Sequence, residues 1–402
     1  MASAVLHIKD AYYFEIPKFA WPAEYSTKAE FPAVWVRLDP DYQLWEAQRL
    51  YGKYAALREK AASFDELKEQ YCAWKEQHAN AGKPFDEFLT EKDSAWFKEY
   101  LATPANAEKW QSAVRESRDV KAYQSDSAHK WAPEKVAAYN RHLSGKILIP
   151  QPFGELRNLY QRDSGLCISK FMILELLVSV VLCLVFGWLA RRIHKSDRPR
   201  GRIWNLLEVF VMFIRDQVAR PAIGHHDADR FVPLLLSLFF FILGCNLAGM
   251  LPWLGSPTAS FGTTLGLAAV AFGTVVVSGV AKLGPVGFFT NMAPKIDLPW
   301  IISLPISTFV LLIEVASLCI KHGVLAVRLL ANMCAGHIVL ISIMMLAFSV
   351  QGAMSSTWSI TAVISLVGST LLSILELFVA FLQAYVFTFL SALFIGSAIH
   401  HH

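Results

Sequence analysis

The chain has 402 residues and a formal net charge of +4, with 54% hydrophobic and 17% charged residues. Only seven of its 70 Asp, Glu, Lys and Arg residues lie after residue 230, so the net charge describes neither half. This asymmetry argues against a single soluble domain and indicates a water-facing N-terminal region joined to an integral membrane region.

The six cysteines are scattered without the spacing of a metal site or a redox motif, and most of them sit in apolar stretches. We therefore interpret them as small core residues rather than as a disulfide framework. They are Cys72, Cys167, Cys183, Cys245, Cys319 and Cys334.

Residues 1–165 are predicted to form a soluble or peripheral, mostly helical extension. Two amphipathic helices are expected after an extended aromatic start, over about 42–80 and, with interruptions, over about 106–143. The region contains no P-loop, no Gly-rich fingerprint and no His/Glu metal pattern, and its start resembles neither a secretory signal nor a transit peptide. Trp and Tyr among Lys and Glu suit docking on a protein neighbour or on lipid head groups. A solvated domain with an aromatic core is an equal alternative.

Residues 166–200 are predicted to hold the first membrane span and a basic linker. The apolar run 171–190 is bounded by Lys170 and by Arg191 and Arg192. Its 20 residues are long enough to cross a hydrocarbon core of about 30 Å. Glu175 lies one turn inside this span, and we expect its side chain to reach back to the interface.

Residues 201–400 are predicted to form the membrane core. In the segment 203–223, apolar residues alternate with charged ones at helical spacing, which predicts an amphipathic helix on the membrane surface. A second span is expected over about 231–251 and a third over about 263–281.

The last two apolar segments, 301–348 and 358–396, would measure roughly 70 Å and 60 Å as helices, about twice the bilayer core. Either each is two short spans broken inside the membrane, for example at residues 321–323, or each is one steeply tilted helix. Their matching lengths favour a tilted hairpin. The expected fold is thus an all-α integral membrane protein with about five membrane helices, one surface helix and the N-terminal extension.

The positive-inside bias orients these spans. The basic connections, 191–230 and 282–300, fall on one side of the membrane, and the uncharged ones, 252–262 and 350–357, fall on the other. The C-terminus is then expected on the basic side and the N-terminal region on the opposite side.

The polar residues of the final hairpin form a small set: Glu314, Arg328, Asn332, His337, Glu376 and Gln383. An arginine at mid-bilayer costs about 3 kcal/mol on insertion scales and cannot shed its charge. Helical spacing places Asn332 on the same face as Arg328 and His337 on the opposite face. Glu376 and Gln383 share a face of the last segment.

An imidazole and a carboxylate are suited to passing protons near neutral pH. A lone intramembrane histidine is usually hydrogen-bonded to a neighbouring helix, and a lone glutamate can be protonated and structural. Because two acids, one His and one Arg occur together in adjacent overlong helices, a functional polar path is favoured over these alternatives.

Several runs now carry a family resemblance. The run AVRLLANMCAGH at 326–337 resembles the signature of subunit a of F-type ATP synthases in its mitochondrial form, and ELFVAFLQAYVFT at 376–388 is similar to the last helix of that family. NLAGMLP at 246–252, with Pro257 and Thr258, resembles a further block. FIRD at 213–216 and RFVP at 230–233 fit the surface helix and the next span.

The resemblance implies a stator that faces a rotating ring of subunits, each with one mid-membrane carboxylate. Arg328 matches the arginine that keeps the ring carboxylate ionised and blocks a proton leak between two offset half-channels. Glu314 matches an acid of the matrix-side half-channel. His337 and Glu376 match the His/Glu pair of the intermembrane-space half-channel, whose order is reversed in bacterial relatives.

Asn332 and Gln383 match polar neighbours of the proton path and of the arginine. The implied partners are the rotor c-ring, the peripheral stalk and other membrane subunits of the synthase. A dimer partner is expected through the N-terminal extension, and no nucleic acid. No metal or cofactor is implied, although structural lipids such as cardiolipin would fit. The implied location is the mitochondrial inner membrane, with the N-terminal region in the intermembrane space and the C-terminus in the matrix.

Two features limit the resemblance. Relatives usually carry a proline about six residues before the arginine, where this chain has Lys-His-Gly at residues 321–323. The resemblance does not extend to residues 1–165, so it implies no role for them. One alternative is a structural membrane subunit that keeps the fold but does not conduct, although charges kept in lipid argue against it. A secondary transporter is another alternative, but no internal repeat supports it.

Overall fold

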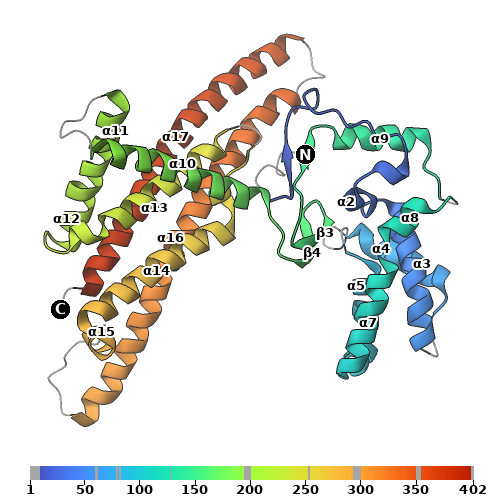
Figure 1. The fold of residues 1–402 in the computed structure, drawn as a ribbon, viewed down its shortest axis with the longest axis horizontal. Coiled ribbons are helices and arrows are strands. Elements are labelled where there is room, and N and C mark those ends of the chain that lie inside the picture. The colour runs from blue at the N-terminus through green and yellow to red at the C-terminus, as the bar shows by residue number, and fades with distance from the viewer. Residues whose placement is uncertain are drawn as a thin grey trace. The chain divides into compact units, whose positions relative to one another are not determined.

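The computed structural model describes residues 10–58, 62–77, 80, 83–127, 129–193, 201–251, 254–292, 300–349 and 355–399 (Figure 1). The chain divides into two compact units. The N-terminal unit is Ala11–Ile168, and the membrane unit is Ser169–His402 together with Met1–Asp10. The three-part division of the chain that we expected, at 165 and 200, stays a prediction.

The N-terminal unit combines short helices with two small antiparallel sheets. Strand β1 pairs with β2, with Phe14 opposite Ile147, and β3 pairs with β4. The strands are β1 (Tyr13–Glu15), β2 (Lys146–Leu148), β3 (Gly154–Asn158) and β4 (Gln161–Gly165). The helices are η1 (Lys28–Glu30), α2 (Ala33–Val36), α3 (Pro40–Leu57), α4 (Phe64–Glu76), α5 (Phe85–Lys92), α6 (Ser94–Tyr100), α7 (Pro104–Ser117), α8 (Val120–Ser125) and α9 (Pro133–Leu143).

The single helix predicted over 42–80 is wrong. Helix α3 ends at Leu57, after which Arg58 adopts an extended backbone. Ser63 then caps α4, because its hydroxyl accepts a hydrogen bond from the Glu66 amide at 3.4 Å. The short helices α5 and α6 were not predicted. The second predicted helix, over 106–143, is divided among α7, α8 and α9, two of which begin with a proline at the first turn.

Aromatic side chains build the interior of this unit. One cluster packs the fully buried Tyr54 and Phe97 with their rings stacked, and a second gathers Phe31 and Tyr123. The largely buried Lys28 donates hydrogen bonds to the carbonyls of Tyr123, Asp126 and His129 at 2.6, 3.0 and 2.8 Å. The Lys28 ammonium thereby holds the segment that follows α8 in place. Burial lowers the pKa of Lys28.

In the described part of the membrane unit, five helices are long and apolar enough to cross a membrane, as predicted. These candidate spans are Lys170–Arg192, Ala228–Gly249, Phe261–Leu283, Ile306–Leu346 and Trp358–Ile399. They lie in α10 (Lys170–Ile193), α13 (Ala228–Gly249), α14 (Phe261–Leu283), α16 (Trp300–Ser349) and α17 (Ser355–Ile399). The shorter elements are α11 (Arg202–Phe213), the π-helical η2 (Ile214–Ala219), α12 (Arg220–Ile223), η3 (Pro257–Ala259) and α15 (Pro285–Met292).

The predicted amphipathic helix corresponds to α11, η2 and α12, and its apolar face packs into the membrane unit. Ile214, Val218 and Ile223 are fully buried in the main core with residues of α13 and α17. A side chain at Gly396 of α17 would overlap the Ala222 carbonyl of α12, with a β-carbon only 2.0 Å away. Hydrogen bonding to Arg215 lowers the pKa of Asp216 on the exposed face, where Asp216 also pairs with Arg220 at 2.8 Å.

Helices α16 and α17 are each continuous through their described residues. The alternative of a break at residues 321–323 is therefore wrong. His322 stays within the helix because its Nδ1 lies 2.9 Å from the Leu318 carbonyl one turn earlier. Its buried ring packs between the rings of Phe272 and Phe394, at centroid distances of 5.3 and 4.9 Å.

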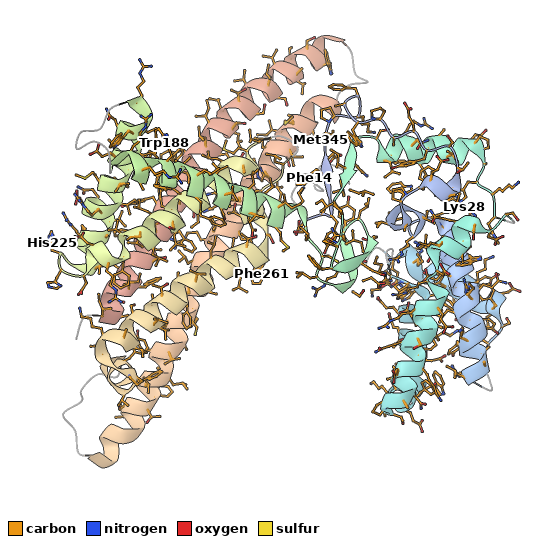
Figure 2. The ribbon with its side chains drawn as sticks, in the orientation of Figure 1. Phe14, Lys28, Trp188, His225, Phe261 and Met345 are labelled. Carbon is orange, nitrogen blue, oxygen red and sulfur yellow. The ribbon has the colours of Figure 1, made fainter. Side chains whose placement is uncertain are left out.

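Much of the apolar surface of the membrane unit faces outward. Leu176 and Leu184 of α10 are 66% and 68% exposed, and Leu366 of α17 is 68% exposed. Figure 2 labels Trp188, Phe261 and Met345, which are also exposed. Such surfaces suit contact with lipid or with neighbouring membrane subunits.

Candidate functional site: polar groups of the membrane hairpin

Helices α16 and α17 run antiparallel in one register. The Ser365 hydroxyl donates to the Ile343 carbonyl at 2.6 Å. Further along, His337 lies opposite Glu376. In an antiparallel pair the sum of facing residue numbers is nearly constant, so the position facing Arg328 falls close to Gln383. Two residues far apart in sequence therefore share one level of the hairpin.

His337 and Glu376 meet in the interior of this hairpin. The His337 Nδ1 lies 2.9 Å from the Glu376 Oε1, and the two side chains are 15% and 6% exposed. The Nε2 of His337 is buried and has no hydrogen-bond partner among the described residues. The imidazole can thus hold or release a proton between Glu376 and a further acceptor such as water.

Because Gly336 has no side chain, the Glu376 carboxylate can lie close to the backbone of α16 at this position. A β-carbon at this position would lie 3.0 Å from the Glu376 Oε1. The carboxylate consequently rests against the backbone of α16, next to the histidine that follows in sequence. The sequence analysis selected His337 and Glu376 but gave no role to Gly336, which directly precedes the histidine.

Arg328 points out of the unit. Its side chain is exposed, and the adjacent Val327 is 52% exposed. None of the carboxylates that the structure describes forms an ion pair with it. Ala331 and Ala335 continue the exposed strip, whereas Asn332 is half-buried. The arginine therefore stands in a face of small and apolar residues that a partner helix can approach closely.

Glu314 lies on the same helix but toward its other end. Fourteen residues separate it from Arg328, which is roughly 21 Å along α16, whereas His337 is about 14 Å away in the opposite direction. The Glu314 Oε1 lies 3.5 Å from the Lys321 Nζ, and both side chains are nearly half-exposed. Sequence reasoning did not identify Lys321 as the partner, although two helical turns separate the pair.

A buried asparagine joins three elements near Glu376. Asn246 of α13 donates to the Ala380 carbonyl of α17 at 3.1 Å and accepts from the Thr258 hydroxyl of η3 at 2.7 Å. Ser256 extends the network, 3.0 Å from Thr258. Sequence reasoning quoted Asn246 and Thr258 for the resemblance but gave them no structural role. An asparagine inside an apolar span was the available signal.

The expectation that Glu175 reaches back to the interface stays a prediction. Its carboxylate accepts a hydrogen bond from the Thr263 hydroxyl, near the start of α14, at 2.6 Å. The six cysteines are all free. Among the described residues, no group of three or more His, Cys, Asp and Glu side chains is arranged to hold a metal ion.

Among the described residues, five apolar helices with an inward His–Glu pair and an outward arginine are those of a polytopic membrane protein with ionisable groups in its helical hairpin. A sequence model described as "ATP synthase A chain" matches residues 172–396, so the chain belongs to that family. It is 36% identical over 275 residues to ATP synthase subunit a of Chloroherpeton thalassium, covering 67% of this chain and 78% of that protein.

Two further relatives extend the comparison. The chain is 40% identical over 238 residues to ATP synthase subunit a of Anaeromyxobacter sp. strain Fw109-5, covering 58% of this chain and 55% of that protein. It is 36% identical over 252 residues to ATP synthase subunit a of Myxococcus xanthus, covering 62% and 79%. The chain thus spans between about half and four fifths of these bacterial relatives.

Proposed function

We propose that this chain is the proton-conducting stator subunit of a rotary F-type ATP synthase and performs no covalent chemistry itself. One observation carries the proposal: Arg328 is an exposed guanidinium in the middle of a 41-residue apolar segment of α16, and no described carboxylate pairs with it. A charge in lipid needs a counter-ion. The best-fitting counter-ion is the carboxylate of a rotor subunit that passes this face.

The polar groups divide around Arg328 as two offset half-channels require. His337 and Glu376 would carry protons on one side, and Glu314 with Lys321 would serve the other. Gln383, at the level of the arginine, and the half-buried Asn332 would line the gap. A proton that enters one half-channel would leave by the other only after it has been carried on a rotor carboxylate from one half-channel to the other.

The electrostatics explain why rotation follows. An opposite charge within about 4–6 Å lowers the pKa of a carboxyl group by one to three units. A rotor acid approaching Arg328 would therefore release its proton to the exit path, and the acid leaving it would be reprotonated from the entry path. Each crossing yields about 2.3 kcal/mol per 100 mV.

Arg328→Ala should abolish ATP synthesis coupled to a proton gradient, because the rotor carboxylate loses its partner and protons leak directly between the half-channels. Arg191→Ala, which removes a charge at the end of α10, serves as the control. Synthesis would be measured in vesicles containing the assembled complex. Normal coupled synthesis in the Arg328 variant would refute the proposed function.

The proposed partners are the rotor ring, the peripheral stalk and the other membrane subunits, with a dimer contact through the N-terminal unit. The proposed location is the mitochondrial inner membrane, a choice based on the His–Glu order at 337 and 376. The relatives above are bacterial, in which the plasma membrane takes that place. In either membrane, the N-terminal unit would lie on the side from which protons enter during synthesis.

The exposed Cys72 of α4 offers a test of this orientation. In a variant whose other five cysteines are replaced by alanine or serine, a membrane-impermeant maleimide should label sealed mitoplasts or intact spheroplasts. Inverted vesicles should react only after permeabilisation. The opposite pattern would place the N-terminal unit on the other side.

A further inference from the structure

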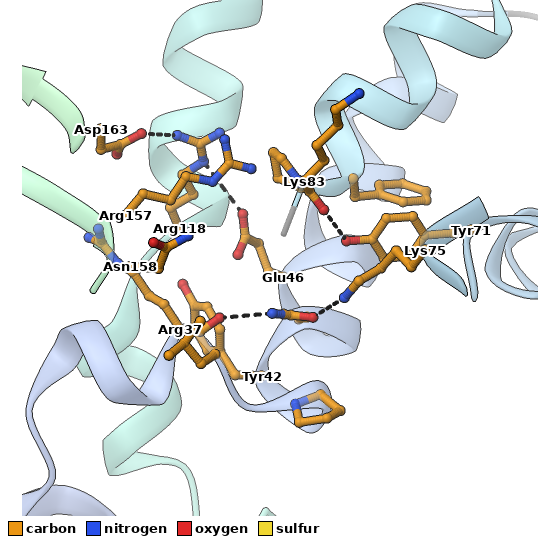
Figure 3. Close-up of a pocket in the computed structure, with 15 residues that line it drawn as sticks. Arg37, Tyr42, Glu46, Tyr71, Lys75, Lys83, Arg118, Arg157, Asn158 and Asp163 are labelled. Carbon is orange, nitrogen blue, oxygen red and sulfur yellow. Dashed lines mark hydrogen bonds and ion pairs between the residues drawn. The ribbon is translucent and has the colours of Figure 1, made fainter. Parts of the chain in front are cut away.

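The N-terminal unit has a cavity of about 280 Å³ between α3, α4, the start of α5, the end of α7 and the β3–β4 sheet. Figure 3 shows the side chains that line it, with Glu46 near the centre and Lys83 extending away from it. This volume is at the small end of the range for ligand pockets in proteins. Its lining includes Arg37, Tyr42, Glu46, Arg118, Arg157 and Asp163.

Three hydrogen-bonding groups at this cavity are buried without a partner among the described residues. They are the Tyr42 hydroxyl, the Arg37 Nε and the Arg157 Nη2. Tyr42 is 0% exposed, and burial raises the pKa of its hydroxyl, so it remains a donor. Protein interiors rarely leave such groups unsatisfied. The lining of the cavity therefore contains three buried donor groups without acceptors.

The carboxylates of the cavity are already used by another arginine. Arg118 lies 3.5 Å from Glu46 and 2.7 Å from Asp163, and it also pairs with Asp86 at 3.1 Å. These acids pair with Arg118, and none of them forms an ion pair with Arg37 or Arg157 among the described residues, although both arginines attract the nearby Glu46 electrostatically.

The two other arginines find their carboxylates away from the cavity. The Arg37 Nη2 lies 3.8 Å from the 69%-exposed Glu155, and the Arg157 Nη1 lies 2.9 Å from the 46%-exposed Glu87. Each guanidinium thus pairs through one nitrogen with an exposed carboxylate and keeps another nitrogen buried without a partner among the described residues. Planar guanidinium groups in this arrangement suit an oxyanion with several acceptor oxygens.

Glu46 repels an anion less than a fully ionised carboxylate would. Burial raises its pKa to about 7, against the attraction of Arg118, which lowers it. Near neutral pH the carboxyl group is therefore protonated part of the time.

We propose that this cavity binds a small oxyanion, either inorganic phosphate or a compact carboxylate, held by Tyr42, Arg37 and Arg157. The site lies in the N-terminal unit and is independent of the proton path. The buried Phe85 gives the cavity an apolar wall, and such surroundings strengthen hydrogen bonds.

The test measures binding of phosphate and of citrate to the purified full-length chain in detergent by titration calorimetry. Arg157→Gln and Tyr42→Phe should each weaken binding about tenfold, the size expected for one hydrogen bond to a charged group. Matched controls are Arg141→Gln on the exposed side of α9 and Tyr100→Phe at the end of α6, which should bind as the wild type does. Preference for phosphate or for citrate identifies the class of ligand.

Tyr42→Phe also separates a binding role from a structural one. Removing a hydroxyl without a partner should leave hydrogen exchange of the α3 amides in the anion-free chain as slow as in the wild type, or slower. Added anion should then protect them less than in the wild type. Absence of binding by both probes at millimolar concentration, or equal binding by all variants, would overturn the proposal.

Discussion

Glu46 shows how one buried acid makes the stability of a unit depend on pH. Its pKa is about 7 in the folded chain and near 4.5 when exposed. Below pH 4.5 the group is protonated in both states, and its contribution to stability is fully present. As the pH rises toward 7, the unfolded chain loses its proton first, so that contribution is progressively lost.

Glu46→Gln should remove this pH dependence. Between pH 4 and pH 8 the free energy of unfolding of the wild type, relative to the variant, is expected to fall by about 3 kcal/mol. This difference in the free energy of unfolding would be measured by hydrogen exchange of the α3 amides in the full chain, corrected for the intrinsic rate at each pH. Glu108→Gln on the exposed face of α7 is the control. A difference that stays constant with pH would contradict the shifted pKa.

Single residues also show where sequence reasoning stops. The selection of Arg328, His337 and Glu376 depended on charge in apolar segments and on helical spacing, both of which are local. Their expected roles came from the family resemblance. The hydrogen bond from Thr263 to Glu175 joins positions 88 residues apart, and no spacing rule reveals it. The cavity arginines, Arg37 and Arg157, are likewise separated by most of the N-terminal unit and belong to no motif.

At the scale of elements, helices α16 and α17 approach each other closely where Gly336 faces Glu376. The Glu376 carboxylate occupies its position because Gly336 has no side chain. The helices themselves could be predicted because length and lack of charge identify membrane spans. The breaks between α3, α4, α5 and α6 could not, because they depend on caps and on packing between aromatic residues.

Gly336→Ala should displace the Glu376 carboxylate, because the new β-carbon would lie 3.0 Å from its Oε1. Since small misplacements of a proton-transfer group are costly, proton flux through the assembled membrane sector should fall roughly tenfold or more. Flux would be followed by the quenching of a pH-sensitive dye in vesicles. Gly323→Ala on the same helix meets no atom within 4 Å and should conduct normally. Equal flux in both variants would exclude a role for this contact.

At the scale of the whole molecule, two units of different chemistry share one chain. The membrane unit carries the family match, which covers residues 172–396. The N-terminal unit has its own aromatic clusters and its own cavity. Its composition indicated a water-facing region, but its sheets and its cavity depend on contacts between distant segments.

Deletion of residues 11–165 should leave the five spans able to insert, because their apolar length does not depend on the N-terminal unit. The yield of assembled and dimeric complex is expected to drop, since the proposed docking surface is lost. Native gel electrophoresis of solubilised membranes would compare this deletion with the full-length chain. Unchanged assembly and dimer content would contradict docking through this unit.

The length of α16 has a mechanical consequence. A helical segment of 41 residues measures about 62 Å, so it fits wholly within a 30 Å hydrocarbon core only when inclined by about 60°. An upright helix passing such an inclined one crosses it at a short stretch instead of interlocking along its length. Under the proposed function, such a short contact would let a rotor helix pass with few side chains to separate, while Arg328 would pair with one rotor carboxylate at a time.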